Sequence, residues 1–165
     1  MKGTEIEPRM TNPGVSVPGA MDALQALSKA ANDAAHTAGV PRATIELIGL
    51  RASQINGCSV CLDMHTRGAR KAGLTDERLF TLAAWRDTPY FTDAERAALA
   101  LTEAGTRLAD RAEAIPDDVY QEAAKHFDEQ ALAAVVVSIA LINTWNRLNV
   151  ISGQVAGDWT AQWAN

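Results

Sequence analysis

The sequence predicts an all-α fold of about seven helices, and three observations carry this prediction. Apolar residues recur three and four positions apart along most of the chain, which is the spacing of one face of a helix. Gly, Pro, Thr and Asp residues, which begin or end helices, stand between these periodic stretches. There is no convincing strand, because the one β-prone run, residues 134–137, lies inside a long helical pattern.

The first 17 residues lack helical periodicity. They contain Pro8, Pro13 and Gly14, and residues 1–17 are predicted to form an extended arm that Pro18 closes. A chain of 165 residues is long enough to bury one core. We therefore expect the remaining residues, 18–165, to form a single helical domain.

Helix breakers and caps place the seven helices in order. Gly57 breaks the second helix, Pro116 opens the sixth, and Thr92 begins a capping box with Glu95 ahead of the fifth. The expected helices are 19–37, 41–55, 58–73, 76–85, one that follows Thr92 and runs to about 110, one that starts at 116, and 128–151. The last of these is apolar nearly all round, which predicts a central position, a subunit interface, or both.

Composition and charge exclude several classes of protein. The chain has 15 basic and 20 acidic residues, a formal net charge of −5 and no run of Lys or Arg, so we expect no nucleic-acid partner. Residues 1–9 carry acids and no apolar stretch, which argues against a signal peptide. The longest apolar run, residues 131–142, is interrupted by Ser138 and is too short to span a bilayer. The expected location is therefore the cytoplasm, with no membrane partner.

The most informative stretch holds the only two cysteines of the chain, spaced Cys58-x-x-Cys61-x-x-x-His65. In a reducing compartment a close cysteine pair is more often catalytic or metal-binding than a structural staple. Both thiols can lie on one face of a helical turn, and Cys58 follows Gly57 at the helix start, where the dipole favours a thiolate. The spacing also permits a disulfide, so one thiolate can attack and the other can resolve.

His65 lies in phase with both cysteines and can accept or steer a thiol proton. Glu46 is the nearest upstream carboxylate, on the preceding helix. If the two helices pack as a hairpin, Glu46 can reach His65 and complete a proton relay. The predicted catalytic residues are Cys61, Cys58, His65 and Glu46.

Two other interpretations of the cysteine pair remain open at this point. The cysteines can be small core residues, or Cys58, Cys61, His65 and Glu46 can supply four zinc ligands. Structural zinc sites usually bring a second Cys/His pair, whereas His36 and His126 are isolated and are expected at the surface or at helix ends. We predict no metal and, in the absence of a flavin or nicotinamide motif, no bound cofactor.

Residues 56–66, around the cysteine pair, resemble the signature of the carboxymuconolactone decarboxylase / alkylhydroperoxidase D-like (AhpD-like) family. The resemblance extends over about residues 6–160. Further matching stretches are Leu50–Ile55, Ala84–Arg86, Phe91–Leu99 and Ile142–Asn149.

This resemblance implies an AhpD-like helical bundle, a homo-oligomer (trimers and hexamers occur in the family) and thiol-dependent reduction of organic hydroperoxides. It implies that Cys61 attacks the peroxide, Cys58 resolves, and Glu46 and His65 form the relay. An external dithiol on a partner protein, by family analogy a lipoyl group, would reduce the disulfide. The dipole argument alone favours Cys58 as the more acidic thiol, but His65 lies one turn from Cys61. Val60 replaces a second relay histidine, which puts the efficiency of the peroxidase in question.

Two alternative functions follow from the same residues. A lyase that decarboxylates a γ-lactone acid is the other named family activity, but it does not depend on a cysteine pair. A non-enzymatic oligomeric redox sensor is the third hypothesis. The candidate pocket walls are Trp85, Tyr90, Phe91 and Trp145, and Arg147 is expected to pair with an acid or cap carbonyls.

Overall fold

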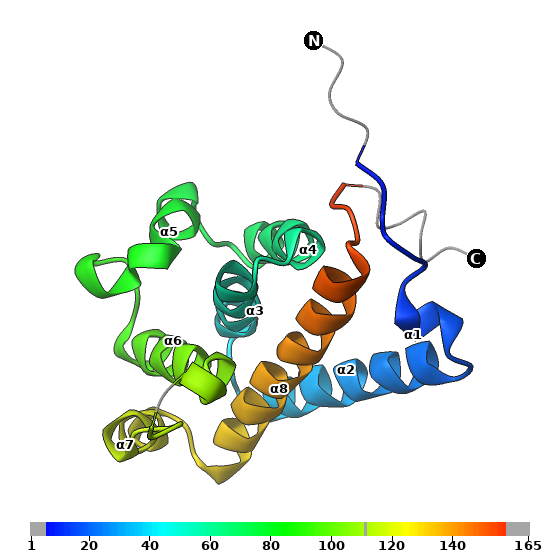
Figure 1. The fold of residues 1–165 in the computed structure, drawn as a ribbon. Helices are drawn as coiled ribbons and strands as arrows, with labels where there is room; N and C mark the ends of the chain where they lie inside the picture. The colour runs from blue at the N-terminus through cyan, green and yellow to red at the C-terminus, as the bar shows by residue number, and fades with distance from the viewer. Residues whose placement is uncertain (1–5, 111, 158–165) are drawn as a thin grey trace.

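Eight α-helices and two 3-10 helices follow one another in the computed structural model, which describes residues 6–110 and 112–157. Those residues contain no strand, so the predicted all-α class is confirmed (Figure 1). The elements are α1 Pro13–Ser16, α2 Ala20–Thr37, α3 Arg42–Asn56, α4 Ser59–Lys71, α5 Asp76–Thr81, η1 Leu82–Asp87, α6 Asp93–Thr106, η2 Leu108–Asp110, α7 Asp117–His126 and α8 Glu129–Ser152.

Two helices form the centre of the bundle. Helix α3 packs against α4, α6 and α8, and α8 also packs along α2 (Figure 1). Every residue from Thr44 to Leu50 is buried, so α3 has no solvent face over this stretch. A carboxylate on this part of α3, Glu46, is therefore carried into the interior, where it needs partners.

The predicted caps account for most of the boundaries. Gly57 ends α3 with a left-handed φ of 68°, and Thr92 and Glu95 make both hydrogen bonds of the capping box of α6. The predicted 76–85 helix is instead α5 followed by the tighter η1, with a kink at Ala84. This winding turns Trp85 into the core, where its Nε1 donates to Glu103 at 3.0 Å.

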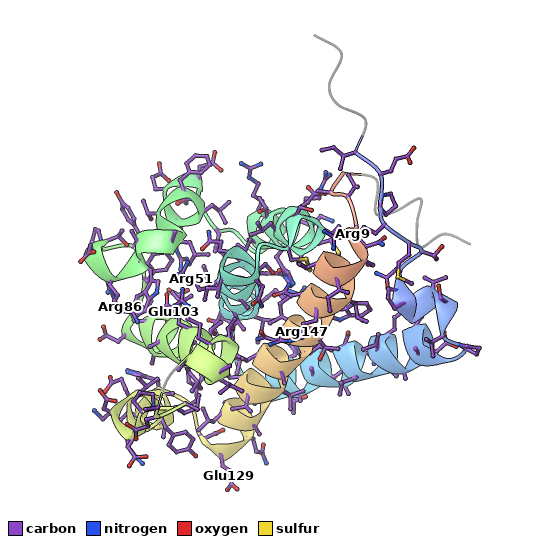
Figure 2. The ribbon with its side chains drawn as sticks, in the orientation of Figure 1. Arg9, Arg51, Arg86, Glu103, Glu129 and Arg147 are labelled. Carbon is purple, nitrogen blue, oxygen red and sulfur yellow. A yellow bond between two sulfur atoms is a disulfide. The ribbon has the colours of Figure 1, made fainter. Side chains whose placement is uncertain are left out.

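Glu103 on α6 is the centre of a buried ion cluster, which Figure 2 shows between α3, η1 and α6. It accepts from Arg51 Nε and Arg86 Nη1, each at 2.7 Å, besides Trp85. Burial raises the pKa of Glu103, but these hydrogen bonds and the charge of Arg51 outweigh it and hold the pKa below its ordinary value. The cluster ties η1 to the bundle.

The N-terminal arm folds back along the end of α8 (Figure 1). Arg9 N donates to Ser152 O at 2.9 Å, and Gln154 Nε2 donates to Met10 O at 2.9 Å. The arm includes the single helical turn α1, which the sequence analysis did not predict. Because residues 1–5, 111 and 158–165 lie outside the described residues, the division into an arm 1–17 and a domain 18–165 stays a prediction.

Helix α8 is longer than its apolar run suggested. Its 24 residues include an 18-residue stretch with a mean hydropathy of 1.5, so the helix is long and apolar enough to cross a membrane by length and composition. Half of that stretch is buried in the fold, and α8 lies between α2, α3 and α6, so the predicted central position is confirmed. The predicted bounds 128–151 are confirmed to within one residue; only the apolar length, taken as residues 131–142, was too short.

Candidate active site

The two cysteines lie at the turn between α3 and α4. Cys58 is the N-cap of α4, and its Sγ accepts from Cys61 N at 3.3 Å. The pair forms a disulfide with Cα atoms 5.4 Å apart. Both side chains are buried, at 1% and 3% exposed. The predicted placement of Cys58 at a helix start, with a disulfide possible across the turn, is thus found.

Glu46 and His65 are brought together because α3 and α4 pack as a hairpin. Glu46 Oε2 lies 2.7 Å from His65 Nδ1, and Glu46 Oε1 accepts from Arg42 Nε at 2.7 Å. The contact on which the predicted relay depends therefore exists. The catalytic roles of these residues and of the two cysteines stay predictions.

The electrostatics favour an ionised Glu46. Burial raises the pKa of this carboxyl, but the hydrogen bond from His65 and the charges of His65 and Arg42 outweigh it and hold the pKa below its ordinary value of 4.5. A carboxylate can only accept, so His65 presents Nδ1–H to Glu46 in both its charged and its neutral form. The Nε2 atom is then the site of His65 that can gain or lose a proton.

We expect Glu46→Gln to lower the free energy of unfolding by about 1–3 kcal/mol at neutral pH, because the amide cannot accept from both His65 and Arg42. The folded-state pKa of Glu46 lies below its unfolded value of 4.5, so its stabilisation is present above that pH and is lost as pH falls through the folded pKa. The difference between the variant and the wild type should therefore shrink as the pH falls below 4.5 and through the folded pKa. Urea unfolding across this range measures it, and a difference that grows in acid would contradict the assignment.

Two glycines inside helices allow α3 and α4 to pack this closely. A Cβ built on Gly49 of α3 would lie 2.5–2.7 Å from three ring atoms of His65. One built on Gly68 of α4 would lie 2.6–2.7 Å from the carboxylate of Glu46. Neither glycine is among the predicted site residues, although an isolated glycine in a helical pattern is a signal of close packing.

A cavity of about 350 Å³ lies among α2, α3, α4 and α8. Cys61 and His65 both line it, whereas Cys58 does not. The lining residues are Gln25, Ser28, Ala31, Asn32, Arg42, Ile45, Ile48, Gly49, Cys61, Met64, His65, Ser138, Leu141, Ile142, Trp145 and Asn149. A small molecule in the cavity would therefore lie against Cys61 and His65 together.

Three of the four predicted pocket walls are wrong. Trp145 lines the cavity, but Trp85 and Phe91 are buried in a separate apolar cluster with Leu82, and Tyr90 is exposed. The physical reason is that η1 directs Trp85 toward Glu103, away from the cysteines.

Three asparagines on α8 form a polar row that the sequence analysis did not single out. Asn143 and Asn146 both accept from Asn56 Nδ2, at 3.0 and 2.8 Å, and Asn149 Nδ2 donates to Cys61 Sγ at 3.3 Å. Asparagines three residues apart in an otherwise apolar helix were the available signal. Arg147 Nη1 donates to the carbonyl of Asn143 at 2.9 Å, which is the predicted structural role.

The remaining histidines lie where they were expected. His36 is exposed near the end of α2, and His126 Nε2 lies 3.2 Å from Glu122 on the surface of α7. Within residues 6–110 and 112–157, no group of three or more His, Cys, Asp and Glu side chains is placed to hold a metal ion.

Comparison with known proteins gives the family. The sequence matches the model of the carboxymuconolactone decarboxylase family over residues 18–104. It is 40% identical over 117 residues to the uncharacterised protein YdfG of Bacillus subtilis, which covers 71% of this chain and 78% of that protein. A shorter match, 44% identical over 43 residues, is to the alkyl hydroperoxide reductase AhpD of Bradyrhizobium diazoefficiens, and covers 26% of this chain and 24% of that protein.

Solved structures agree with the sequence matches. A protein of unknown function from Agrobacterium tumefaciens, for which an AhpD role in antioxidant defence has been suggested, superposes with a TM-score of 0.80 at 34% identity. The match covers 92% of this chain and 99% of that one. The debrominase Bmp8 in complex with 2,3,4-tribromopyrrole superposes with a TM-score of 0.75 over 91% of this chain and 78% of that one. Its identity is 20%, so it shows the fold alone.

Proposed function

Because the chain belongs to the carboxymuconolactone decarboxylase family, we propose that it is an AhpD-like thiol-dependent peroxidase that reduces organic hydroperoxides. One observation carries the proposal: Cys61 and His65 line the same cavity, and Glu46 holds His65 from behind. A sulfur nucleophile, a proton carrier and a fixed carboxylate are what a thiol peroxidase requires.

The first step uses the reduced pair. The thiolate of Cys61 attacks the terminal oxygen of ROOH, the S–O bond forms, and the O–O bond breaks with its electron pair going to RO⁻. A proton delivered by way of His65 Nε2 converts RO⁻ to ROH, and Cys61 becomes a sulfenic acid. Glu46 keeps Nδ1–H hydrogen-bonded throughout, so only Nε2 exchanges the proton.

The second step regenerates a disulfide. The thiol of Cys58 attacks the sulfur of the Cys61 sulfenic acid, an S–S bond forms, and the hydroxyl leaves as water after protonation. The disulfide between Cys58 and Cys61 corresponds to this oxidised state. An external dithiol, with a protein-bound lipoyl group as the candidate, then reduces it and becomes a disulfide itself.

The proposed proton relay has only two members, because Val60 stands at the position of the third. It is 1% exposed and packs in the same apolar cluster as both cysteines, where the family pattern has a second histidine. Proton delivery in this chain would therefore depend on Glu46 and His65, so a peroxidase slower than one with the full relay is expected. Decarboxylation would leave the cysteine pair unused, which makes it the weaker candidate.

The test is a single turnover without added reductant. Fully reduced protein is mixed with excess cumene hydroperoxide, and thiols, disulfide and cumyl alcohol are quantified. The proposal expects two thiols lost and one alcohol formed per chain. Reduced protein that forms no alcohol, or that instead releases bromide from a bromopyrrole, would refute it in favour of a different reaction.

We also propose that the protein is a cytoplasmic homo-oligomer, a trimer or a hexamer. The support is a stripe of apolar side chains on the outer face of α8, at helical spacing. The members of this α8 stripe are Ala133, Val136, Val137, Ala140 and Ile151, all of them exposed. A second copy of the chain is the occupant that the family resemblance favours.

Val136→Asp should dissociate this assembly, because it places a carboxylate in the α8 stripe, where Val136 is 47% exposed. Sedimentation velocity of the full chain should show a fall to a smaller species. The matched control is Val15→Asp on α1, where Val15 is 44% exposed outside the stripe, and its sedimentation should equal that of the wild type. A wild-type protein that sediments as a monomer would contradict the oligomer.

A further inference from the structure

The sulfur of Cys61, a residue that lines the cavity, is contacted by an amide of α8. Asn149 Nδ2 lies 3.3 Å from Cys61 Sγ, and Asn149 is 3% exposed and itself lines the cavity. A donor at this position is poised to stabilise negative charge on the sulfur once the disulfide is reduced.

A chain of hydrogen bonds fixes which end of this amide faces the sulfur. The backbone N–H of Gly14 can only donate, and it donates to Asn12 Oδ1 at 2.9 Å. Asn12 must then present Nδ2 to Asn149 Oδ1, and it does so at 2.8 Å. Asn149 is left with its donor, Nδ2, toward Cys61.

We propose that Asn149 is a catalytic residue that stabilises the Cys61 thiolate by donating a hydrogen bond to it, and that Asn12 is a positioning residue that keeps the Asn149 amide in this orientation. The inference rests on the proposed function, in which Cys61 is the attacking sulfur. It gives the N-terminal arm a role in the site, since Asn12 is 4% exposed and caps α1 from within the arm.

This contact also bears on which cysteine is the nucleophile. The α4 dipole acts on both thiols in the first turn, and alone it favours Cys58 at the N-cap. Asn149 touches Cys61, the cysteine that lines the cavity. The N–H donor of Asn149 would thus stabilise the thiolate of Cys61, the cysteine on the cavity side of the pair.

Several other charged or titratable groups surround Cys61 and act on its thiol. Cys58 and His65 lie on or at the start of α4, and Arg42 and Glu46 come from α3. The side chains that α2 and α8 contribute to the cavity are neutral. The substitutions below leave all of these groups in place except Cys58, which is replaced equally in every sample.

The test measures the thiol of Cys61 directly, in a Cys58→Ser background where Cys61 is the only cysteine. Serine is a good N-cap, so α4 keeps its start. The rate of alkylation by iodoacetamide is followed against pH. Asn149→Ala should raise the apparent pKa of Cys61 by about one unit, a tenfold lower ratio of thiolate to thiol. The matched control, Asn143→Ala, removes a buried amide of the same helix that does not touch the sulfur, and should leave the profile unchanged.

Substitutions of Asn12 test the orientation without touching the site. Asn12→Asp keeps an N-cap for α1 but only accepts, so Asn149 must turn its donor toward residue 12 and its carbonyl oxygen toward the sulfur. The apparent pKa should rise at least as much as in Asn149→Ala. Asn12→Ser keeps a neutral cap that reaches less far, and should give a smaller rise. If circular dichroism shows that Asn149→Ala is unfolded, the two Asn12 variants provide the test instead.

The outcomes separate this inference from the proposed function. An unchanged pKa in folded Asn149→Ala, or an equal rise in Asn143→Ala, overturns the role of Asn149, even if the protein reduces hydroperoxides. Unchanged profiles in both Asn12 variants overturn the positioning role. A pKa that rises as expected supports the inference even if the wild type reduces no hydroperoxide, since alkylation needs no peroxide.

Discussion

Cys61→Ser should abolish hydroperoxide reduction, with a loss of about 10³-fold or more, because a serine hydroxyl is not ionised at neutral pH and cannot accept the peroxide oxygen. The substitution changes one atom in a side chain that lines the cavity, so the fold and the cavity should be kept. The measurement is the yield and rate of cumyl alcohol in a single turnover of reduced protein.

Cys58→Ser provides the matched comparison. Without Cys58 the sulfenic acid on Cys61 has no resolving partner, so one hydroperoxide should be reduced per chain and the sulfenic acid should persist. A dimedone adduct on Cys61, detected by mass spectrometry, would report it. If Cys61→Ser retains the first turnover and Cys58→Ser loses it, the two roles are reversed, as the helix dipole alone would have favoured.

Gly49→Ala should disable the site and destabilise the fold together. In a helix interior this change usually stabilises by about 0.5–1 kcal/mol, because glycine is a poor helix former. Here the new Cβ would lie 2.5–2.7 Å from the His65 ring, so the imidazole or α4 must move. Overpacking of this kind costs about 1–3 kcal/mol, and displacing a catalytic group by about 1 Å can lower the rate about 100-fold. Urea unfolding and the initial rate of cumyl alcohol formation measure the two effects.

The control for this prediction is Gly105→Ala on α6. Its Cβ would lie 3.1 Å from a methyl group of Ile139, and neither residue lines the cavity, so stability should change by less than about 1 kcal/mol and activity should be kept. Gly68→Ala should behave like Gly49→Ala, since its Cβ would meet the Glu46 carboxylate. A Gly49→Ala protein as stable and active as the wild type would show that the close approach has no role.

Local sequence signals predicted the helices well wherever a cap or breaker is chemically specific. Gly57 marks the end of α3 and the capping box at Thr92 marks the start of α6, but α6 ends at Thr106 and not at about 110 as predicted. Local signals failed to predict the backbone conformation where tertiary contacts determine it. The winding of η1 depends on the hydrogen bond from Trp85 to Glu103, and the turn α1 depends on Asn12 and its contact with Asn149.

By itself the sequence determined which residues the candidate site draws from one helix. The spacing of Cys58, Cys61 and His65 puts them in phase, and helical geometry fixes this relation without knowledge of the rest of the fold. The sequence also identified Glu46 on the preceding helix as the candidate partner of His65, but their contact depended on the packing of the two helices.

Only the tertiary structure decided which groups from distant elements complete the site. It placed Trp145 rather than Trp85 at the cavity, brought Asn149 against Cys61, and left Cys61 rather than Cys58 facing the open space. The physical reason is that these contacts depend on how α8 and α2 pack across the α3–α4 hairpin. That packing is set by the complementarity of whole buried faces and not by any local spacing.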